Sequence, residues 1–136
     1  MTTRFLLDTN VLSQLIRDPR GPVATRLATA GDAQVFTSVV VASELRFGAS
    51  KKGSTVLTDR VNQLLASIEV APLEVGVDRI YADIRNALES TGQLIGANDL
   101  FIAAHALEQE ATLVTDNVAE FQRVPGLQIE NWVRPT

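Results

Sequence analysis

Short apolar runs alternate with longer segments in which apolar residues recur at helical spacing. The short runs predict strands at residues 4–8, 34–37, 69–73 and 112–115, with a further candidate strand at 127–132. Helical spacing is clearest at 11–16, 61–68, 80–88 and 100–107, and Phe121 lies on a short helical turn. Strands that alternate with helices are typical of an α/β fold, a mainly parallel sheet with helices on both faces.

Glycine and proline mark several of the boundaries between these elements. Residues 18–21 (DPRG) should end the first helix, Pro22 suits the first position of the next, and Gly31 should end it. Residues 50–54 (SKKGS) are predicted to form a polar, basic loop. No repeat or interdomain linker interrupts the pattern, so residues 1–136 are expected to form a single domain.

The segment that follows the second predicted strand has two interpretations. Ser38 could cap a helix that carries Glu44. The three valines at 39–41 instead favour a strand by propensity. Both interpretations stay open from the sequence.

Composition narrows the class of protein. The chain has 136 residues, 46% of them hydrophobic, no cysteine and a formal net charge of -4. The lack of cysteine excludes disulfides and thiolate metal sites. No apolar run approaches the roughly 20 residues that span a bilayer, and the start shows no signal-peptide pattern, so a cytoplasmic protein without membrane association is expected. The net charge argues weakly against a large nucleic-acid footprint, unless bound cations cancel some of the acids.

Four acidic residues lie beside apolar segments, and together they predict a metal site. They are Asp8, Glu44, Asp99 and Asp116. Asp8 and Asp116 each follow a predicted strand, and ligand sites in parallel sheets lie beyond the carboxyl ends of the strands. Asp99 would lie in the first turn of a helix, where the helix dipole favours negative charge. Carboxylate oxygens are the ligands of hard cations, so we expect Mg²⁺ or Mn²⁺ there.

Each of these acids also has a purely structural interpretation. Asp8 could cap the helix after its strand, Asp99 could be an ordinary acid at a helix N-terminus, and Glu44 could be a solvated glutamate. Asp116 could form a turn with the asparagine that follows it. His105, the only histidine, lies six residues beyond Asp99, which is about 600° of helix rotation, so it faces away and is expected to be structural.

Four motifs give the chain a family resemblance. They are LDTN at 7–10, SELRFG at 43–48, GANDLFIAAHA at 96–106 and TDNVAEF at 115–121, and the ending RVPGLQIENW at 123–132 fits the same group. In this order and at these spacings the chain resembles PIN-domain proteins, and among them the VapC-type toxins of bacterial toxin–antitoxin pairs. The resemblance spans nearly the whole chain.

The resemblance implies a magnesium-dependent endoribonuclease that works as a homodimer and is neutralised by a cognate antitoxin protein. It assigns metal binding to Asp8, Glu44 and Asp99, and places Asn10 and Thr115 as polar residues beside these ligands. Many relatives carry a fourth acid where this chain has Asn117. Either Asp116 supplies that carboxylate from the adjacent position, or it points away.

The chemistry implied is hydrolysis of an RNA phosphodiester by a metal-bound water, which leaves 5′-phosphate and 3′-hydroxyl ends. Three cations are candidate contacts for RNA phosphates, or else a solvated patch. They are Arg46, Lys51 and Lys52.

Three other functions compete with this one. A haloacid-dehalogenase-like phosphatase needs a second aspartate where Asn10 stands, and a receiver-like module needs a lysine after a late strand, whereas no lysine follows Lys52. A PIN fold that only binds RNA or a partner is the main alternative, and the presence of all three core acids argues against it.

Overall fold

A parallel sheet forms the centre of the protein. The computed structural model describes residues 3–30 and 34–135; Gly31, predicted to end a helix, lies outside them. Within these residues five strands pair in parallel in the order β3-β2-β1-β4-β5. The strands are β1 (Arg4–Leu7), β2 (Gln34–Ser38), β3 (Glu69–Ala71), β4 (Thr112–Val114) and β5 (Ile129–Glu130).

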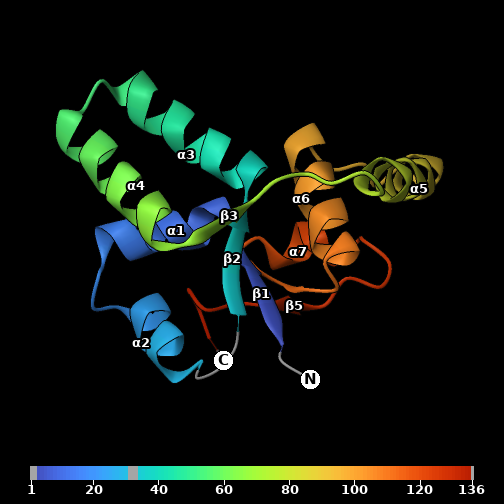
Figure 1. Ribbon diagram of the computed structural model, residues 1–136. Helices are drawn as coiled ribbons and strands as arrows, with labels where there is room; N and C mark the ends of the chain where they lie inside the picture. Colours follow the sequence, from blue (N-terminus) through green and yellow to red (C-terminus); the bar gives the residue numbers. More distant parts are fainter. Residues whose placement is uncertain (1–2, 31–33, 136) are drawn as a thin grey trace.

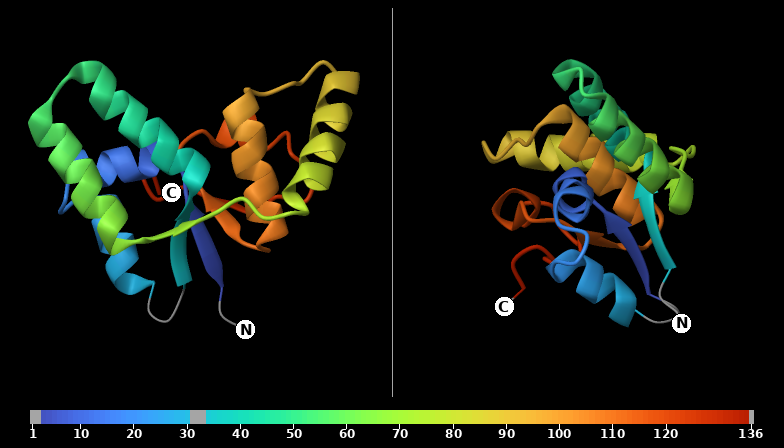
Figure 2. Two further views of the ribbon diagram at one scale, coloured as in Figure 1. Left: turned by 45° about the horizontal axis from the view of Figure 1, so that its top comes forward. Right: turned by 90° about the vertical axis from the view of Figure 1, so that its left-hand side faces the viewer.

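The helices form two groups on either side of this sheet (Figure 1). One group, packed through α1–α3 and α3–α4 contacts, contains α1 (Thr9–Arg17), α2 (Pro22–Thr29), α3 (Val39–Lys52) and α4 (Thr55–Ser67). The other contains α5 (Val77–Ser90) and α6 (Ala97–Glu108), which pack on each other, and the one-turn α7 (Val118–Phe121) follows β4. Figure 2 shows the α3–α4 hairpin and the α5–α6 pair diverging from the sheet like the two arms of a V.

The order of the strands locates the functional edge. β1 lies between β2 and β4, so the chain winds outward from β1 in one direction through β3 and then returns to β4 on the other side. Ligands in open parallel sheets bind beyond the carboxyl ends of the strands where the winding reverses. Here that place lies just after Leu7 and Val114, which are partners in the β1–β4 register.

The ambiguous segment after β2 is helical. Ser38 ends β2, and its hydroxyl accepts a hydrogen bond from the Val40 backbone N–H at 3.1 Å, which caps α3. Val41 is fully buried in the core, so tertiary packing outweighs the strand propensity of the valines. The helix therefore carries Glu44 in its second turn.

Three predicted boundaries were wrong. The predicted loop at 50–54 is mostly helix, because α3 continues to Lys52 and ends at Gly53, whose φ of 65° is left-handed. The α4 helix then begins at once at Thr55, with Ser54 accepting a hydrogen bond from Leu57 N–H at 3.1 Å. The strands predicted at 69–73 and 127–132 are shorter, since only Glu69–Ala71 and Ile129–Glu130 pair with neighbours.

Both faces of the central strands are buried. Leu6, Leu7, Phe36 and Leu113 are inaccessible to solvent, as expected for a sheet covered by helices on both faces. His105 is also fully buried, and its Nδ1 lies 2.8 Å from Ser38 Oγ, so the predicted structural role of this histidine agrees with its surroundings. Among the described residues, no helix is long and apolar enough to cross a membrane.

Candidate metal centre

Asp8 lies at the carboxyl end of β1 and is the most buried of the acids. Its side chain is only 4% exposed and caps α1, because Oδ1 accepts a hydrogen bond from Thr9 N–H at 2.8 Å. Oδ2 accepts from the Thr115 hydroxyl at 2.8 Å and from Asn10 Nδ2 at 3.3 Å. Burial raises the pKa of Asp8, and the hydrogen bonds oppose that shift. Asp8 therefore both caps α1 and lies at the carboxyl edge of the sheet.

Asn10 and Thr115 join the ends of β1 and β4. Asn10 Oδ1 accepts from Asp116 N–H at 2.9 Å, and Thr115 Oγ1 accepts from Asn117 N–H at 3.0 Å. Thr115 is fully buried. The two residues that the sequence placed beside the metal ligands thus hold Asp8 and the backbone after β4 in one network.

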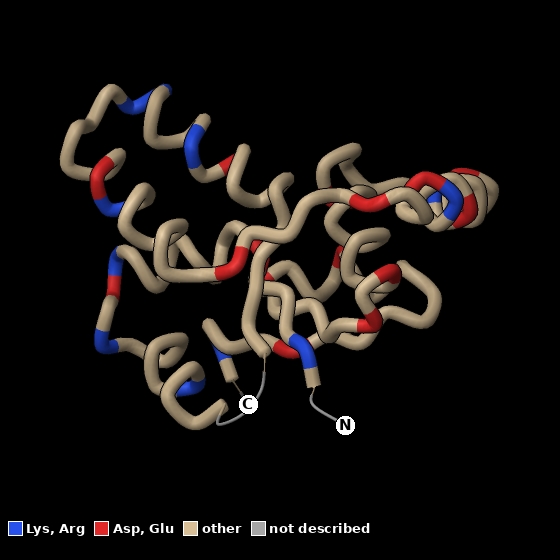
Figure 3. The backbone as a smooth tube through the Cα atoms, viewed as in Figure 1, with Lys and Arg blue, Asp and Glu red and all other residues tan. Residues whose placement is uncertain are grey.

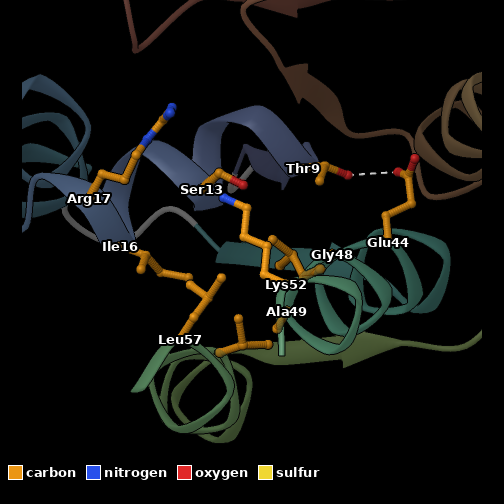
Figure 4. A pocket seen from close by; sticks show the side chains of 11 residues that line it. Thr9, Ser13, Ile16, Arg17, Glu44, Gly48, Ala49, Lys52 and Leu57 are labelled. Carbon is orange, nitrogen blue, oxygen red and sulfur yellow. Dashed lines mark hydrogen bonds between the residues drawn. The ribbon is translucent and has the colours of Figure 1, made fainter. Parts of the chain in front are cut away.

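Glu44 reaches the same edge from α3. Its Oε1 accepts a hydrogen bond from the Thr9 hydroxyl at 2.7 Å, which ties α3 to the start of α1 (Figure 4). The side chain is half-buried and is one of the charges that raise the pKa of Asp8. The structure thus brings Glu44 to Asp8, as the sequence predicted for a shared site.

Asp99 lies in the first turn of α6, where the sequence placed it. Its pKa is raised to about 7, first by burial, then by the negative charges of Glu120, Asp8 and Glu44, together with a hydrogen bond to Glu120. Asp99 therefore lies where several negative charges come together without a compensating cation among these residues.

Glu120 is the residue that the sequence analysis missed. It lies on α7, accepts a hydrogen bond from Gly96 N–H at 3.4 Å through Oε1, and accepts another from Asn117 Nδ2. Its charge is the largest electrostatic contribution to the raised pKa of Asp99. The only signal was an acid three residues after Asn117 in the last motif, at helical spacing.

Asp116, which the sequence offered as the fourth carboxylate, turns toward the C-terminal segment instead. Its Oδ1 and Oδ2 accept hydrogen bonds from Arg134 Nε at 2.8 Å and Nη2 at 3.0 Å, and Oδ1 also accepts from Asn131 Nδ2 at 3.0 Å. The hydrogen bonds from Arg134 and Asn131 lower its pKa, opposite to the shift at Asp99. A carboxylate already paired with arginine is a poor candidate for a metal ligand, so this placement of Asp116 disagrees with the structure.

We call Asp8, Glu44, Asp99 and Glu120 the acidic cluster, and its donor chemistry suits a hard cation. All its donors are carboxylate oxygens, and burial, followed by the charges of the neighbouring acids, raises the pKa of Asp8 and Asp99. Within residues 3–30 and 34–135, no three acids or histidines stand close enough to form a ready-made metal cage. Mg²⁺ suits such an open arrangement, because it keeps several waters and commonly takes only one or two carboxylates plus substrate phosphates.

The three candidate cations point in different directions. Arg46 Nη1 donates to Asn62 Oδ1 at 2.6 Å, and Lys51 Nζ lies 6.0 Å from the centre of the Phe47 ring. Only Lys52 lines a pocket that also contains Glu44, together with Arg17. Most lysines and arginines of the chain lie on the half formed by α1 to α4 (Figure 3).

Comparison with known proteins agrees with this architecture. Residues 5–127 match the PIN domain family. Ribonuclease VapC2 of Rickettsia felis is 35% identical over 130 residues, covering 94% of this chain and 97% of the relative.

Two solved structures superpose closely. The VapBC2 complex of Rickettsia felis, bound to a DNA fragment from its promoter, matches with a TM-score of 0.88 and 33% identity over 96% of this chain and 99% of the other. VapBC-1 of nontypeable Haemophilus influenzae matches with a TM-score of 0.86 and 31% identity, and the match covers 97% of this chain and 100% of the other chain. The family model matches most of the chain, and the relatives match nearly all of it. The chain therefore belongs to the PIN-domain family, among the VapC ribonucleases.

Proposed function

We propose that this protein is a metal-dependent endoribonuclease toxin that a cognate antitoxin holds inactive. Its relatives are named as ribonucleases, and the superposed structures are VapBC complexes. The observation that carries the metal dependence is the acidic cluster, in which burial and three neighbouring acids raise the pKa of Asp99 to about 7. Such a cluster repels an RNA phosphate unless a cation stands between them.

Asp8 and Asp99 would hold the Mg²⁺ or Mn²⁺, with Glu44 and Glu120 at its sides. When bound, the metal supplies a water of lowered pKa and neutralises charge on the phosphoryl oxygens. The Thr115 hydroxyl and Asn10 keep the Asp8 carboxylate in place, and the Thr9 hydroxyl does the same for Glu44. These hydrogen bonds hold the ligand oxygens before the substrate arrives, which is how protein sites limit the cost of reorganisation.

Glu120, rather than Asp116, takes the fourth acidic position in this proposal. Asn117 stands where many relatives carry the fourth acid. Its side chain donates a hydrogen bond to Glu120 and so orients it. Arg134 meanwhile pairs with both carboxylate oxygens of Asp116. This arrangement explains how the chain keeps four acids at the site although it has asparagine at position 117.

Cleavage of single-stranded RNA by three variants tests the assignment. Asp99→Asn and Glu120→Gln should each lower the Mg²⁺- or Mn²⁺-dependent rate by about 10- to 100-fold or more, because each removes a charge at the metal. Asp116→Asn is the matched control and should keep most of the rate. Circular dichroism checks that all three variants are folded.

Two results would contradict the assignment. Undiminished cleavage in chelator would remove the metal from the mechanism, and loss of activity in Asp116→Asn but not in Glu120→Gln would return the fourth position to Asp116. A chain that binds RNA without cleaving it would be the binding module considered above.

The partner proteins are tested separately. Co-expression with a cognate antitoxin should abolish RNA cleavage and restore growth. The homodimer implied by the family resemblance stays a prediction, which sedimentation of the purified protein measures directly.

A further inference from the structure

The two helical arms of the structure meet close to His105. The α3–α4 hairpin and the α5–α6 pair diverge like a V, and they pack on each other chiefly through α3 and α6 (Figure 2). Glu44 lies on α3 and Asp99 lies on α6, so the acidic cluster takes one acid from each arm. The geometry of the cluster therefore depends on the angle between the arms.

A hydrogen bond joins the arms where they meet. His105 Nδ1, on α6, lies 2.8 Å from the hydroxyl oxygen of Ser38, the residue that caps α3. Both residues are fully buried. In the described part of the chain, no other hydrogen bond joins α3 or its cap to α6. We call this bond the tie between the arms.

The partners of the tie show where its protons lie. The Ser38 oxygen already accepts from Val40 N–H at 3.1 Å, so its own proton can go to His105 Nδ1. Burial lowers the pKa of His105, which keeps the ring neutral and leaves Nδ1 as an acceptor. The ring proton is then on Nε2, which makes no hydrogen bond of ordinary geometry within residues 3–30 and 34–135, although the Pro72 carbonyl is near enough to favour it. A leucine would fill this space without an unsatisfied buried donor, so packing alone does not explain the histidine.

The tie lies at the same distance along each helix from the acid that the helix carries. Glu44 is six residues after Ser38, and Asp99 is six residues before His105, which is roughly 9 Å along each helix. Over that length, a rotation of one arm by about 5° at the tie would move its acid by about 0.8 Å. Metal–ligand distances tolerate only about 0.2 Å. A small change in the angle between the arms would therefore misplace a metal ligand.

Charge opposes the correct angle before a metal binds. Burial raises the pKa of Asp99 most, and the negative charges of Glu120, Asp8 and Glu44 raise it further. Between the arms lies a groove of about 680 Å³ that is lined by Glu44 and by Asn98, the neighbour of Asp99. Repulsion between Glu44 and Asp99 across this groove favours a wider V. A tie at the base of the V opposes that movement.

We propose that the hydrogen bond between His105 and Ser38 fixes the angle between the two arms and so holds Glu44 and Asp99 at the separation that one metal ion requires. The two residues are positioning residues, because they act through the helices that carry the acids. This inference rests on the proposed metal-dependent function and names the contact that shapes its site.

The affinity for Mn²⁺, measured by calorimetry, distinguishes the tie from an ordinary loss of stability. Ser38→Ala should raise the Kd for Mn²⁺ roughly 3- to 10-fold, at or below the lower end of the range for residues that orient metal ligands, because it acts one step further from the metal. Ser54→Ala is the matched control. It removes the corresponding cap from α4 in the same hairpin and should leave the Kd unchanged, although both variants should lose similar stability.

His105→Leu tests the other partner of the tie. It keeps a buried side chain and should raise the Kd for Mn²⁺ as much as Ser38→Ala does. The double variant Ser38→Ala/His105→Leu should bind Mn²⁺ no more weakly than either single variant, because both substitutions remove the same bond. In RNA cleavage, all three variants should need more Mn²⁺ for half the maximal rate and should approach the kcat of the parent at saturating Mn²⁺.

The angle itself is measured between spin labels. The chain has no cysteine, so labels can be attached at Ser50→Cys on α3 and Asn86→Cys on α5, two exposed positions. Labelled protein is diluted with unlabelled protein so that distances within one chain are read. In chelator, pulsed electron paramagnetic resonance should give a longer or broader distribution of distances in Ser38→Ala than in Ser54→Ala.

The outcomes separate this inference from the proposed function. If the parent neither binds Mn²⁺ nor cleaves RNA, the proposed function fails, and this inference fails with it. If the parent binds Mn²⁺ while Ser38→Ala and Ser54→Ala have the same Kd or the same label distances, the tie is refuted and the proposed function stands. Losses of affinity that simply add in the double variant would also refute it.

Discussion

Neutralising Asp99 should stabilise the metal-free protein at neutral pH. The folded protein raises the pKa of Asp99 from 3.8 to about 7, so between these values the folded state holds a proton that the unfolded state has released. The free energy of unfolding therefore falls with rising pH in this window: the stabilisation by protonated Asp99 is complete below pH 3.8 and is lost as the pH rises through about 7. Asp99→Asn cannot ionise and should escape this loss.

The size of the effect follows from the shift and the exposure of the carboxyl group. A shift of about 3 pKa units corresponds to about 4 kcal/mol without screening. Asp99 is only half-buried, so solvent screening reduces this to about 1–2 kcal/mol at pH 8. Such a gain would raise the melting temperature by several degrees.

Urea unfolding in chelator at pH 5 and pH 8 measures this difference. Asp99→Asn should be more stable than the parent at pH 8, and most of that gain should disappear at pH 5. Asp83→Asn, at an exposed acid on α5, is the control and should give no such pH-dependent gain. The reasoning would be refuted if Asp99→Asn were no more stable than the parent at pH 8, or if its gain were the same at both values.

Three further predictions concern the metal, the hydrogen bond to Asp8 and the Asp116–Arg134 pair. Saturating Mg²⁺ should raise the free energy of unfolding of the parent, by about 2.7 kcal/mol at a hundredfold excess over Kd, and should stabilise Asp99→Asn far less; calorimetry with and without the metal measures both. Thr115→Val should lower the free energy of unfolding by about 1–3 kcal/mol, because the buried Asp8 loses its hydroxyl donor, whereas retained stability in urea would show that this hydrogen bond is unimportant. Arg134→Gln should raise the pKa of Asp116, which NMR titration can follow, and should leave RNA cleavage close to that of the parent, since the pair lies outside the cluster.

The convergence of Asp8 and Asp99 was predictable because it depends on rules of the fold. Alternation of strands and helices predicts parallel pairing, and the carboxyl ends of parallel strands share one edge. Asp8 follows such a strand directly, and Asp99 lies in the first turn of the helix α6, which precedes the strand β4. Thr115 lies one residue beyond β4 and so reaches the same edge. Local patterns were sufficient for Asp8 and Asp99, whereas the expectation for Thr115 came from the family resemblance.

The positions of Glu44 and Glu120 could not be predicted from local sequence patterns. The helix that carries Glu44 begins with three valines, and only the Ser38 cap and the burial of Val41 decide against a strand. Glu120 lies on a helix of four residues, too short for a periodic signal. Both side chains reach the site through tertiary packing, which propensity does not encode.

Asp116 illustrates a different limit. The sequence placed it at the correct edge but could not give the direction of its side chain. That direction depends on Arg134, 18 residues later, and on Asn131, which also accepts hydrogen bonds from the backbone N–H groups of Val133 and Arg134. A hydrogen-bonded pair between side chains of two loops produces no periodic pattern in either segment.

The hydrogen bond between Asp8 and Thr115 joins residues 107 positions apart, which affects the order in which the site forms during synthesis. A ribosome makes Asp8 107 residues before Thr115, and Glu120 follows later still. Before then, β1 lacks its neighbour β4, and Asp8 lacks its hydroxyl donor. A nascent chain would therefore lack the assembled acidic cluster until β4 and α7 have been made, so the proposed metal site forms only late in the growth of this domain.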